Sequence, residues 1–246
     1  MTHPWRWEVF LERVPTGDTT YLGWMLTGLL VTVLLSLAAW AVALVLGSVM
    51  GVFRTVPNRV LSGMAAVYVE VFRNVPLLVQ LFVWYFVVPE LLPARWGTPL
   101  KQLPPTLQQF LAALLCLGFF TGARICEQVR AGIESQSRGQ RAAALALGLT
   151  LPQAYRYVLV PMAFRIIVPP LTSEMVNLVK NSAVASTIGL LELAAMGRQL
   201  VDYTALPYES FLAVTLVYVT VNLVVIAAMR WVERRARVPG LLGGGR

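Results

Sequence analysis

The fold of this chain is decided by residues 22–52, which read LGWMLTGLLVTVLLSLAAWAVALVLGSVMGV. This stretch carries no charged side chain and consists largely of Leu, Val and Ala. About 20 mostly apolar residues are enough for a helix to cross the hydrocarbon core of a bilayer, which is roughly 30 Å thick. The stretch therefore predicts one membrane-spanning helix that is long enough to tilt or to protrude at its ends.

The composition extends this conclusion to the whole chain. Of the 246 residues, 57% are hydrophobic and 13% are charged, whereas soluble domains contain roughly 45–50% apolar and about 25% charged residues. Such a chain cannot cover itself with polar side chains, so the bilayer lipid must be its solvent. We predict an all-α integral membrane protein with no separate soluble domain, because a helix satisfies its own backbone hydrogen bonds in lipid.

About five membrane-spanning helices are predicted from the apolar stretches. They lie at residues 22–52, 61–88, 109–126, 161–191 and 211–229, with a Pro-rich and Gly-containing loop at residues 89–107. Pro76 is expected to kink the second helix, and Pro169 and Pro170 are expected to weaken the fourth.

The distribution of positive charge predicts the orientation of these helices. The turn at 54–59, the segment at 124–165 and the tail from residue 230 hold 13 of the 20 Lys and Arg residues. Cytoplasmic loops of membrane proteins collect Lys and Arg, so the net charge of +8 is explained without nucleic acid. We predict an N-out, C-in arrangement with a periplasmic segment 1–21, a transmembrane domain 22–232 containing a cytoplasmic loop 127–160, and a cytoplasmic tail 233–246.

Several kinds of active site are not expected in this chain. The two cysteines, Cys116 and Cys126, have no metal-ligand spacing, and the one histidine, His3, lies near the N-terminus. No G-x-x-x-x-G-K-[ST] motif is present to cradle a nucleotide phosphate. We expect no metal, no cofactor and no enzymatic activity. A membrane-embedded enzyme would need a nucleophile with its base, and an ion-gradient-driven secondary transporter usually shows an internal repeat, which we do not find.

The most specific segment is residues 139–161, GQRAAALALGLTLPQAYRYVLVP. It predicts a short helix, a turn at Gly148 and a second short helix that Pro161 stops. The Ala-rich first helix has small side chains and a high helix propensity, which suit it to a groove of another protein. The alternative is an amphipathic connector that only packs beneath the membrane.

This segment resembles the EAA loop of ABC importer permeases, in which an E-A-A run is followed by a glycine and an I-x-L-P-like end. The matching positions are Ala142, Ala143 and Ala144 for the run, Gly148 for the glycine and Pro161 for the end. Ala142 departs from the usual Glu, so a polar contact made by that Glu would be missing here.

Three further runs resemble the polar amino-acid permeases within this group. They are EVFRNVPLLVQ at 70–80, EQVRAGI at 127–133, and NLVKNS at 177–182 followed by STIG at 186–189. The runs LGFFTGARICEQ at 117–128 and TTYLGW at 19–24 look most similar to members that import glutamate and aspartate. The resemblance covers most of the chain, and a glutamine or other polar amino-acid importer is the alternative.

The resemblance implies a set of partners and a location. Two permease subunits would sit on two ABC ATPase subunits in the inner membrane of a Gram-negative bacterium, and a periplasmic binding protein would deliver the amino acid. Nucleotide hydrolysis would then take place on the ATPase subunits. The missing Glu at Ala142 favours a second, paralogous permease over a second copy.

Polar residues inside the predicted helices are the candidates for substrate contacts, because a charge at the centre of a span costs about 2.5–3.5 kcal/mol or more. Arg124 can bind a carboxylate of a dicarboxylic amino acid bidentately, or it can anchor its helix among lipid headgroups. The fourth predicted helix carries a polar face that lines either a substrate path or a contact with the partner permease: Glu174, Asn177, Lys180, Asn181 and Ser182.

The second predicted helix carries Glu70, Arg73 and Asn74 on one face, at spacings of three and four residues. We expect Glu70 and Arg73 to form a structural ion pair near the cytoplasmic interface, since the surrounding run is shared by permeases of different substrates.

Overall fold

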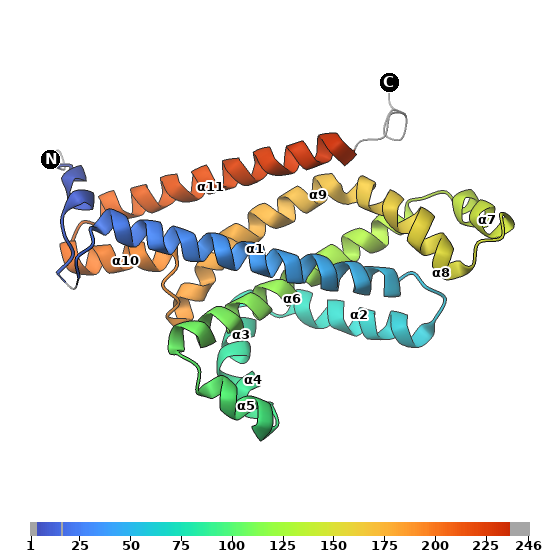
Figure 1. The fold of residues 1–246 in the computed structure, drawn as a ribbon, viewed down its shortest axis with the longest axis horizontal. Coiled ribbons are helices and arrows are strands. Elements are labelled where there is room, and N and C mark those ends of the chain that lie inside the picture. The colour runs from blue at the N-terminus through green and yellow to red at the C-terminus, as the bar shows by residue number, and fades with distance from the viewer. Residues whose placement is uncertain (1–3, 16, 237–246) are drawn as a thin grey trace. The chain divides into compact units, whose positions relative to one another are not determined.

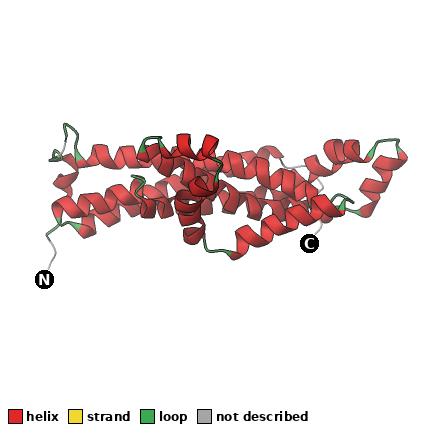
Figure 2. Ribbon diagram, turned by 90° about the horizontal axis from the view of Figure 1, so that it is seen from below, coloured by secondary structure: helices red, strands yellow, loops and turns green. Residues whose placement is uncertain are grey.

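The computed structural model describes residues 4–15 and 17–236, and the α-helices in this part of the chain are shown in Figure 1. In chain order they are α1 (Tyr21–Phe53), α2 (Arg59–Asn74), α3 (Leu77–Phe82), α4 (Val88–Leu91), α5 (Ala94–Lys101), α6 (Pro105–Glu134), α7 (Arg138–Ala146), α8 (Leu151–Ala154), α9 (Val160–Asn181), α10 (Leu193–Thr204) and α11 (Pro207–Ala236). Apart from an isolated bridge between Arg13 and Thr20, these residues form no strand (Figure 2). The all-α prediction is therefore confirmed. Residues 237–246 of the predicted tail lie outside the described residues.

Within the described residues, four helical segments are long and apolar enough to cross a membrane. The number rises to five if a pair of helices joined at a sharp bend counts as one span. The four are α1, α6, the run Leu151–Ile188 and α11, and the pair is Arg59–Asn74 with Leu77–Leu91. The expected number of about five spans is confirmed by length and composition.

The predicted second span is broken at Pro76, as expected. The two helical parts on either side of this proline are bent by 107°, because proline has no N–H to continue the hydrogen-bond ladder and its ring displaces the preceding turn. Asn58 caps α2 by accepting hydrogen bonds from the backbone N–H groups of Val60 and Leu61 at 3.0 and 3.1 Å. The predicted loop at 89–107 is more ordered than expected, since it contains most of α4 and all of α5.

The prediction that Pro161 stops a helix was wrong, and Pro169 and Pro170 do not interrupt the fourth segment. Pro161 follows a π-helical stretch, Tyr155–Leu159, and lies in the first turn of α9. The wider π turn makes room for a ring that an ordinary α turn would exclude. Pro169 and Pro170 lie inside α9, which continues to Asn181.

The ladder of the fourth segment changes only beyond Asn181, where a 3₁₀ stretch, Ser182–Ile188, ends at Gly189. Two serine hydroxyls in this stretch donate to carbonyls three residues earlier, Ser182 to Val179 at 2.8 Å and Ser186 to Ala183 at 2.6 Å. Such side-chain bonds compete with the α-helical ladder. Gly189 has a φ of 90°, which suits glycine because it lacks Cβ.

Residue contacts divide the chain into two compact units. Unit 1 comprises residues 1–39, 76–117 and 177–223, and unit 2 comprises residues 40–75, 118–176 and 224–246. In unit 1, Val9, Val14, Tyr21 and Leu200 form one buried cluster, which orders the segment before α1.

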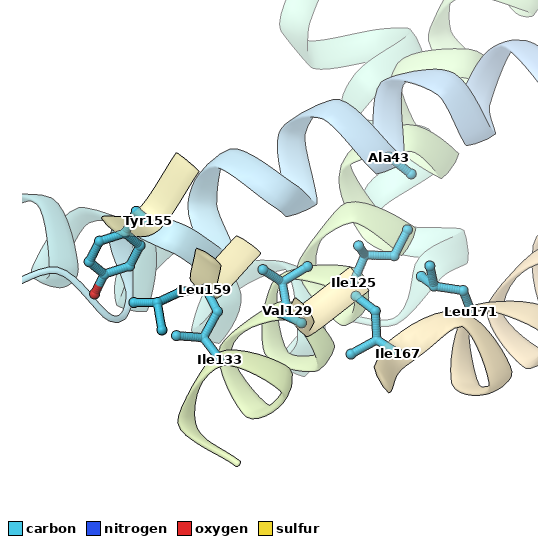
Figure 3. Close-up of a cluster of buried hydrophobic side chains, with 9 residues drawn as sticks. Ala43, Ile125, Val129, Ile133, Tyr155, Leu159, Ile167 and Leu171 are labelled. Carbon is cyan, nitrogen blue, oxygen red and sulfur yellow. The ribbon is translucent and has the colours of Figure 1, made fainter. Parts of the chain in front are cut away.

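The core of unit 2 is a seam of branched side chains (Figure 3). Ile125, Val129 and Ile133 recur every four residues on α6 and are buried in one cluster with Leu159 and Ile167. Hydrophobic burial of this kind contributes about 25 cal/mol per Å² of apolar surface removed from water. Only the part of this cluster that lies outside the bilayer gains this hydrophobic free energy. Within the bilayer, close packing of the side chains stabilises the cluster instead.

Candidate functional site

A polar cavity of about 370 Å³ lies within unit 2. Its lining comes from α2, α6 and α9 and is rich in charge: Arg73, Arg124, Glu127, Gln128, Arg130, Ala131 and Glu174. Three guanidinium groups and two carboxylates face one space inside apolar helices. Such groups in a membrane protein usually mark a cavity or a partner contact.

An ion pair between α6 and α9 forms the buried side of this cavity. Arg124 Nε donates to Glu174 Oε2 at 2.6 Å, and Gln128 Nε2 donates to Glu174 Oε1 at 3.1 Å. Both carboxylate oxygens of Glu174 therefore have a donor, and the residue is only 6% exposed. The Arg124 side chain is 42% exposed, so its remaining N–H groups are accessible for a second carboxylate.

A second group of charges joins the end of α1 to α6. Glu127 lies 3.3 Å from Arg54 Nη2 and 2.9 Å from Arg130 Nη2, and Arg130 Nη1 lies 2.5 Å from Glu134. These pairs satisfy the charges along α6, so the helix extends to Glu134 instead of ending at Cys126. The first residues of the predicted loop, 127–134, thus belong to α6.

The Arg54–Glu127–Arg130–Glu134 chain was not predicted as a unit. The spacings of three and four residues in E-x-x-R-x-x-x-E indicate the two pairs within α6. The sequence alone gives no sign of Arg54, which is far from Glu127 along the chain.

The expected pair of Glu70 and Arg73 is absent from the ion pairs of the described residues. Glu70 Oε2 instead accepts a hydrogen bond from Asn74 Nδ2 at 2.7 Å, one helical turn along α2. Arg73 lines the charged cavity, so it contributes to the site and not to the predicted structural pair.

The other predicted substrate residues belong to unit 1. Ser182 is buried and its hydroxyl donates to the Val179 carbonyl at 2.8 Å. Lys180 is exposed, and Asn177 and Asn181 are partly buried. Of the six predicted residues, the structure therefore brings Arg124 and Glu174 into contact.

The predicted coupling segment forms α7, a turn and α8. Ala142 and Ala143 are exposed while Ala144 is buried, and Leu147 is 84% exposed at the end of α7. Gly148 follows with a φ of 85°, which confirms the predicted glycine turn. The exposed face of α7 thus carries small apolar side chains beside Arg141, a surface suited to a protein groove.

A family model described as "Binding-protein-dependent transport system inner membrane component" matches residues 43–238. The chain belongs to this family. With its several membrane-spanning helices it is a multi-pass inner-membrane protein, and the resemblance to ABC importer permeases is confirmed.

Two individual relatives show which kinds of amino-acid permease this chain is similar to. The "Glutamate/aspartate import permease protein GltJ" of Escherichia coli is 58% identical over 245 residues, which cover 99% of this chain and 100% of the relative. The "Probable glutamine ABC transporter permease protein GlnM" of Bacillus subtilis is 33% identical, covering 83% of this chain and 89% of the relative.

Solved structures give the same fold. An amino acid ABC transporter crystallised with histidines matches with a TM-score of 0.73 and 28% identity, covering 87% of this chain and 95% of that chain. The inward-facing MetNI methionine ABC transporter matches with a TM-score of 0.74 and 21% identity, covering 88% of this chain and 98% of that chain, and this second likeness shows the fold alone.

The described residues of this chain contain no candidate metal site. No group of three or more His, Cys, Asp or Glu side chains is close enough to hold an ion among residues 4–15 and 17–236. Cys116 and Cys126 are both buried and free of disulfides, as expected for packing residues.

Proposed function

We propose that this chain is the membrane-spanning permease subunit of an ATP-driven importer for the acidic amino acids glutamate and aspartate. The observation that carries the substrate assignment is the charged cavity of unit 2, in which the Arg124 guanidinium is partly free. The whole-chain identity of 58% to a glutamate/aspartate import permease supports the same assignment.

The proposed partners follow from the family. Two ABC ATPase subunits would hydrolyse ATP on the cytoplasmic side, where α7 would lie in a groove of one of them. A second, paralogous permease would complete the pathway, and a periplasmic binding protein would deliver the amino acid in a Gram-negative inner membrane. Under this proposal the chain is not an enzyme, and it is oriented N-out and C-in.

The proposed substrate chemistry starts from charge. Glutamate and aspartate carry two carboxylates and one ammonium group, and a planar guanidinium binds a carboxylate through two parallel hydrogen bonds. Arg124 would take one carboxylate with the N–H groups that Glu174 leaves unused. Glu174 would hold Arg124 in place and keep the empty cavity close to neutral, which lowers the cost of these charges in a membrane.

Unit 1 contains further polar residues that would contact the substrate. Asn177, Lys180 and Asn181 lie on one face of α9, at spacings of three and four residues. Ser182 contributes less than the sequence suggested, because its hydroxyl already donates to Val179 at 2.8 Å.

The movement driven by ATP hydrolysis would reach this subunit through the predicted coupling residues. Closure of the ATPase pair would displace α7, whose exposed face includes Ala142 and Ala143, and the Gly148 turn would pass this movement to α8 and α9. Pro161 lies in the first turn of α9, so it belongs to the element that would receive the movement.

The test of the site is Arg124→Ala in the assembled, reconstituted complex. We expect the concentration of glutamate-loaded binding protein needed for half-maximal uptake to be little changed and the maximal rate to fall by about tenfold or more, since hydrogen bonds to charged groups contribute roughly 1.5–3 kcal/mol. Arg124→Lys should retain part of the rate because it keeps the charge. Arg59→Ala, which removes an exposed arginine outside the cavity and outside the coupling segment, is the control. A normal rate in Arg124→Ala would remove Arg124 from the site.

A further inference from the structure

A second polar cavity, of about 230 Å³, lies within unit 2 at the end of α6. A buried water needs only about 10–15 Å³ of such space, so the cavity has room for a small solute. Its polar lining comes from the turn after α1, the end of α6, the loop before α7, α7 and the π-helical stretch: Arg54, Thr55, Glu134, Gln136, Ser137, Arg141 and Tyr155.

Hydrogen-bond donors in this cavity are only partly used. Arg54 Nε is buried and has no acceptor within the described structure, although Nη2 of the same side chain lies 3.3 Å from Glu127. Arg141 is exposed and forms no ion pair with any described residue. Two guanidinium groups with unused N–H bonds form a site for a carboxylate.

An acceptor lies in the same cavity. Gln136 Nε2 donates to the carbonyls of Leu159 at 2.8 Å and Gly132 at 3.2 Å, which fixes the orientation of this amide. Gln136 Oε1 is buried and accepts no hydrogen bond from the described residues. A buried acceptor left without a donor costs about 1–3 kcal/mol, so a ligand ammonium group would be favoured there.

The two cavities share one wall. Glu127 and Arg130 line the first cavity, while Arg54 and Glu134 line the second. These four residues are the members of the ion-pair chain described above, which therefore separates the two cavities.

We propose that the second cavity is a distinct binding site for an α-amino acid, reached from the cytoplasmic side, in which the carboxylate binds Arg54 and Arg141 and the ammonium group binds Gln136 Oε1. This inference rests on the proposed import function, because the transported glutamate is the ligand available on that side. Arg141 directly precedes Ala142 on α7, so a bound amino acid ties α7 to the ends of α1 and α6. A high cytoplasmic concentration of product then slows transport.

The experiment uses the complete complex in proteoliposomes, with the ATPase face and the face that binds the periplasmic protein in separate compartments. Uptake of labelled glutamate is measured while unlabelled glutamate is added on the ATPase side only. We expect inhibition of the wild type, and a rise of about tenfold in the half-inhibitory concentration for Arg141→Ala, which loses charge-assisted hydrogen bonds. Ser137→Asp, which places a carboxylate at an exposed position of the cavity, should weaken inhibition in the same direction.

The controls separate this site from the first cavity and from the proposed function. Arg156→Ala removes an exposed arginine of the same cytoplasmic segment that does not line the cavity, and its half-inhibitory concentration should equal that of the wild type. Each variant is normalised to its own uninhibited rate. Wild-type uptake with no inhibition overturns the second site alone, and so does inhibition that Arg124→Ala weakens but Arg141→Ala and Ser137→Asp leave unchanged. Absence of wild-type uptake would instead contradict the import function.

Discussion

Glu192 is a single buried carboxylate that joins three helices of unit 1. It is fully buried and caps α10 by accepting from the backbone N–H groups of Ala194 and Ala195, at 3.0 and 2.8 Å. Its Oε2 also accepts from the Tyr218 hydroxyl of α11 at 2.7 Å and lies 3.4 Å from the Thr32 hydroxyl of α1. This residue escaped the sequence analysis, since none of these partners except the helix cap is local.

Replacing Glu192 tests this joint and its pH dependence. Burial raises the pKa of Glu192 above its ordinary value of 4.5, so the folded state holds this proton more tightly than the unfolded chain does. Stability contributed by this group is therefore greatest below pH 4.5 and is lost as the pH rises through the raised pKa. We expect the melting temperature of the wild type, relative to Glu192→Gln, to fall over that range. A constant difference between the two proteins would contradict this assignment.

At the site, individual residues were predicted but their contact was not. Arg124 and Glu174 stood out because charged side chains are costly in apolar helices. The sequence does not show that they meet, since 50 residues separate them and helical periodicity relates only neighbours three or four positions apart. Arg73 was predicted to pair with Glu70 but lines the cavity instead, and this difference has the same cause.

At the scale of elements, glycines set how closely α1 and α6 approach. A Cβ on Gly51 would lie 2.6 Å from Val129 Cβ and 2.8 Å from the Cys126 carbonyl oxygen, whereas a Cβ on Gly63 of α2 would meet nothing within 4 Å. The Cys126 carbonyl oxygen belongs to the backbone, which cannot move aside from Gly51 as a flexible side chain can.

Gly51→Ala should therefore destabilise the protein by about 1–3 kcal/mol through overpacking. Gly63→Ala is the matched control, and it should be neutral or stabilising because alanine is the better helix former by about 0.5–1 kcal/mol. Thermal unfolding of the two purified variants measures both effects. Equal melting temperatures would show that α1 and α6 do not pack through Gly51.

The turn after α7 depends on backbone conformation and not on space. Gly148 has a φ of 85°, and a Cβ there would meet no atom within 4 Å. Gly148→Val should thus act only by disfavouring the left-handed conformation, at about 1–2 kcal/mol, and so reorient α7 relative to α8. We expect uptake per ATP hydrolysed to fall several-fold while assembly persists, and Gly148→Asn, which tolerates this conformation, to stay near wild type. Undiminished coupling in Gly148→Val would argue against a role for this turn.

Elements were predicted well where one local cause dominates. The break at Pro76 and the turn at Gly148 follow from the covalent limits of single residues. Pro161, Pro169 and Pro170 have the same local chemistry, yet α9 runs through them; the π turn directly before α9 gives room for the ring of Pro161.

For the whole molecule, hydropathy alone gave the all-α class and about five spans, since the length of each span is set by the bilayer. The pairing of helices within each unit could not be derived, because lipid-facing and protein-facing apolar residues look alike in sequence.

The most direct test of the account measures ATP hydrolysis by the complex of this chain, its partner permease and the ATPase subunits in proteoliposomes with the binding protein. We predict that glutamate and aspartate stimulate hydrolysis and that uptake stops without ATP. Stimulation by glutamine but not by the acidic amino acids would contradict the substrate assignment. Uptake driven by an ion gradient in the absence of the ATPase would contradict the central claim.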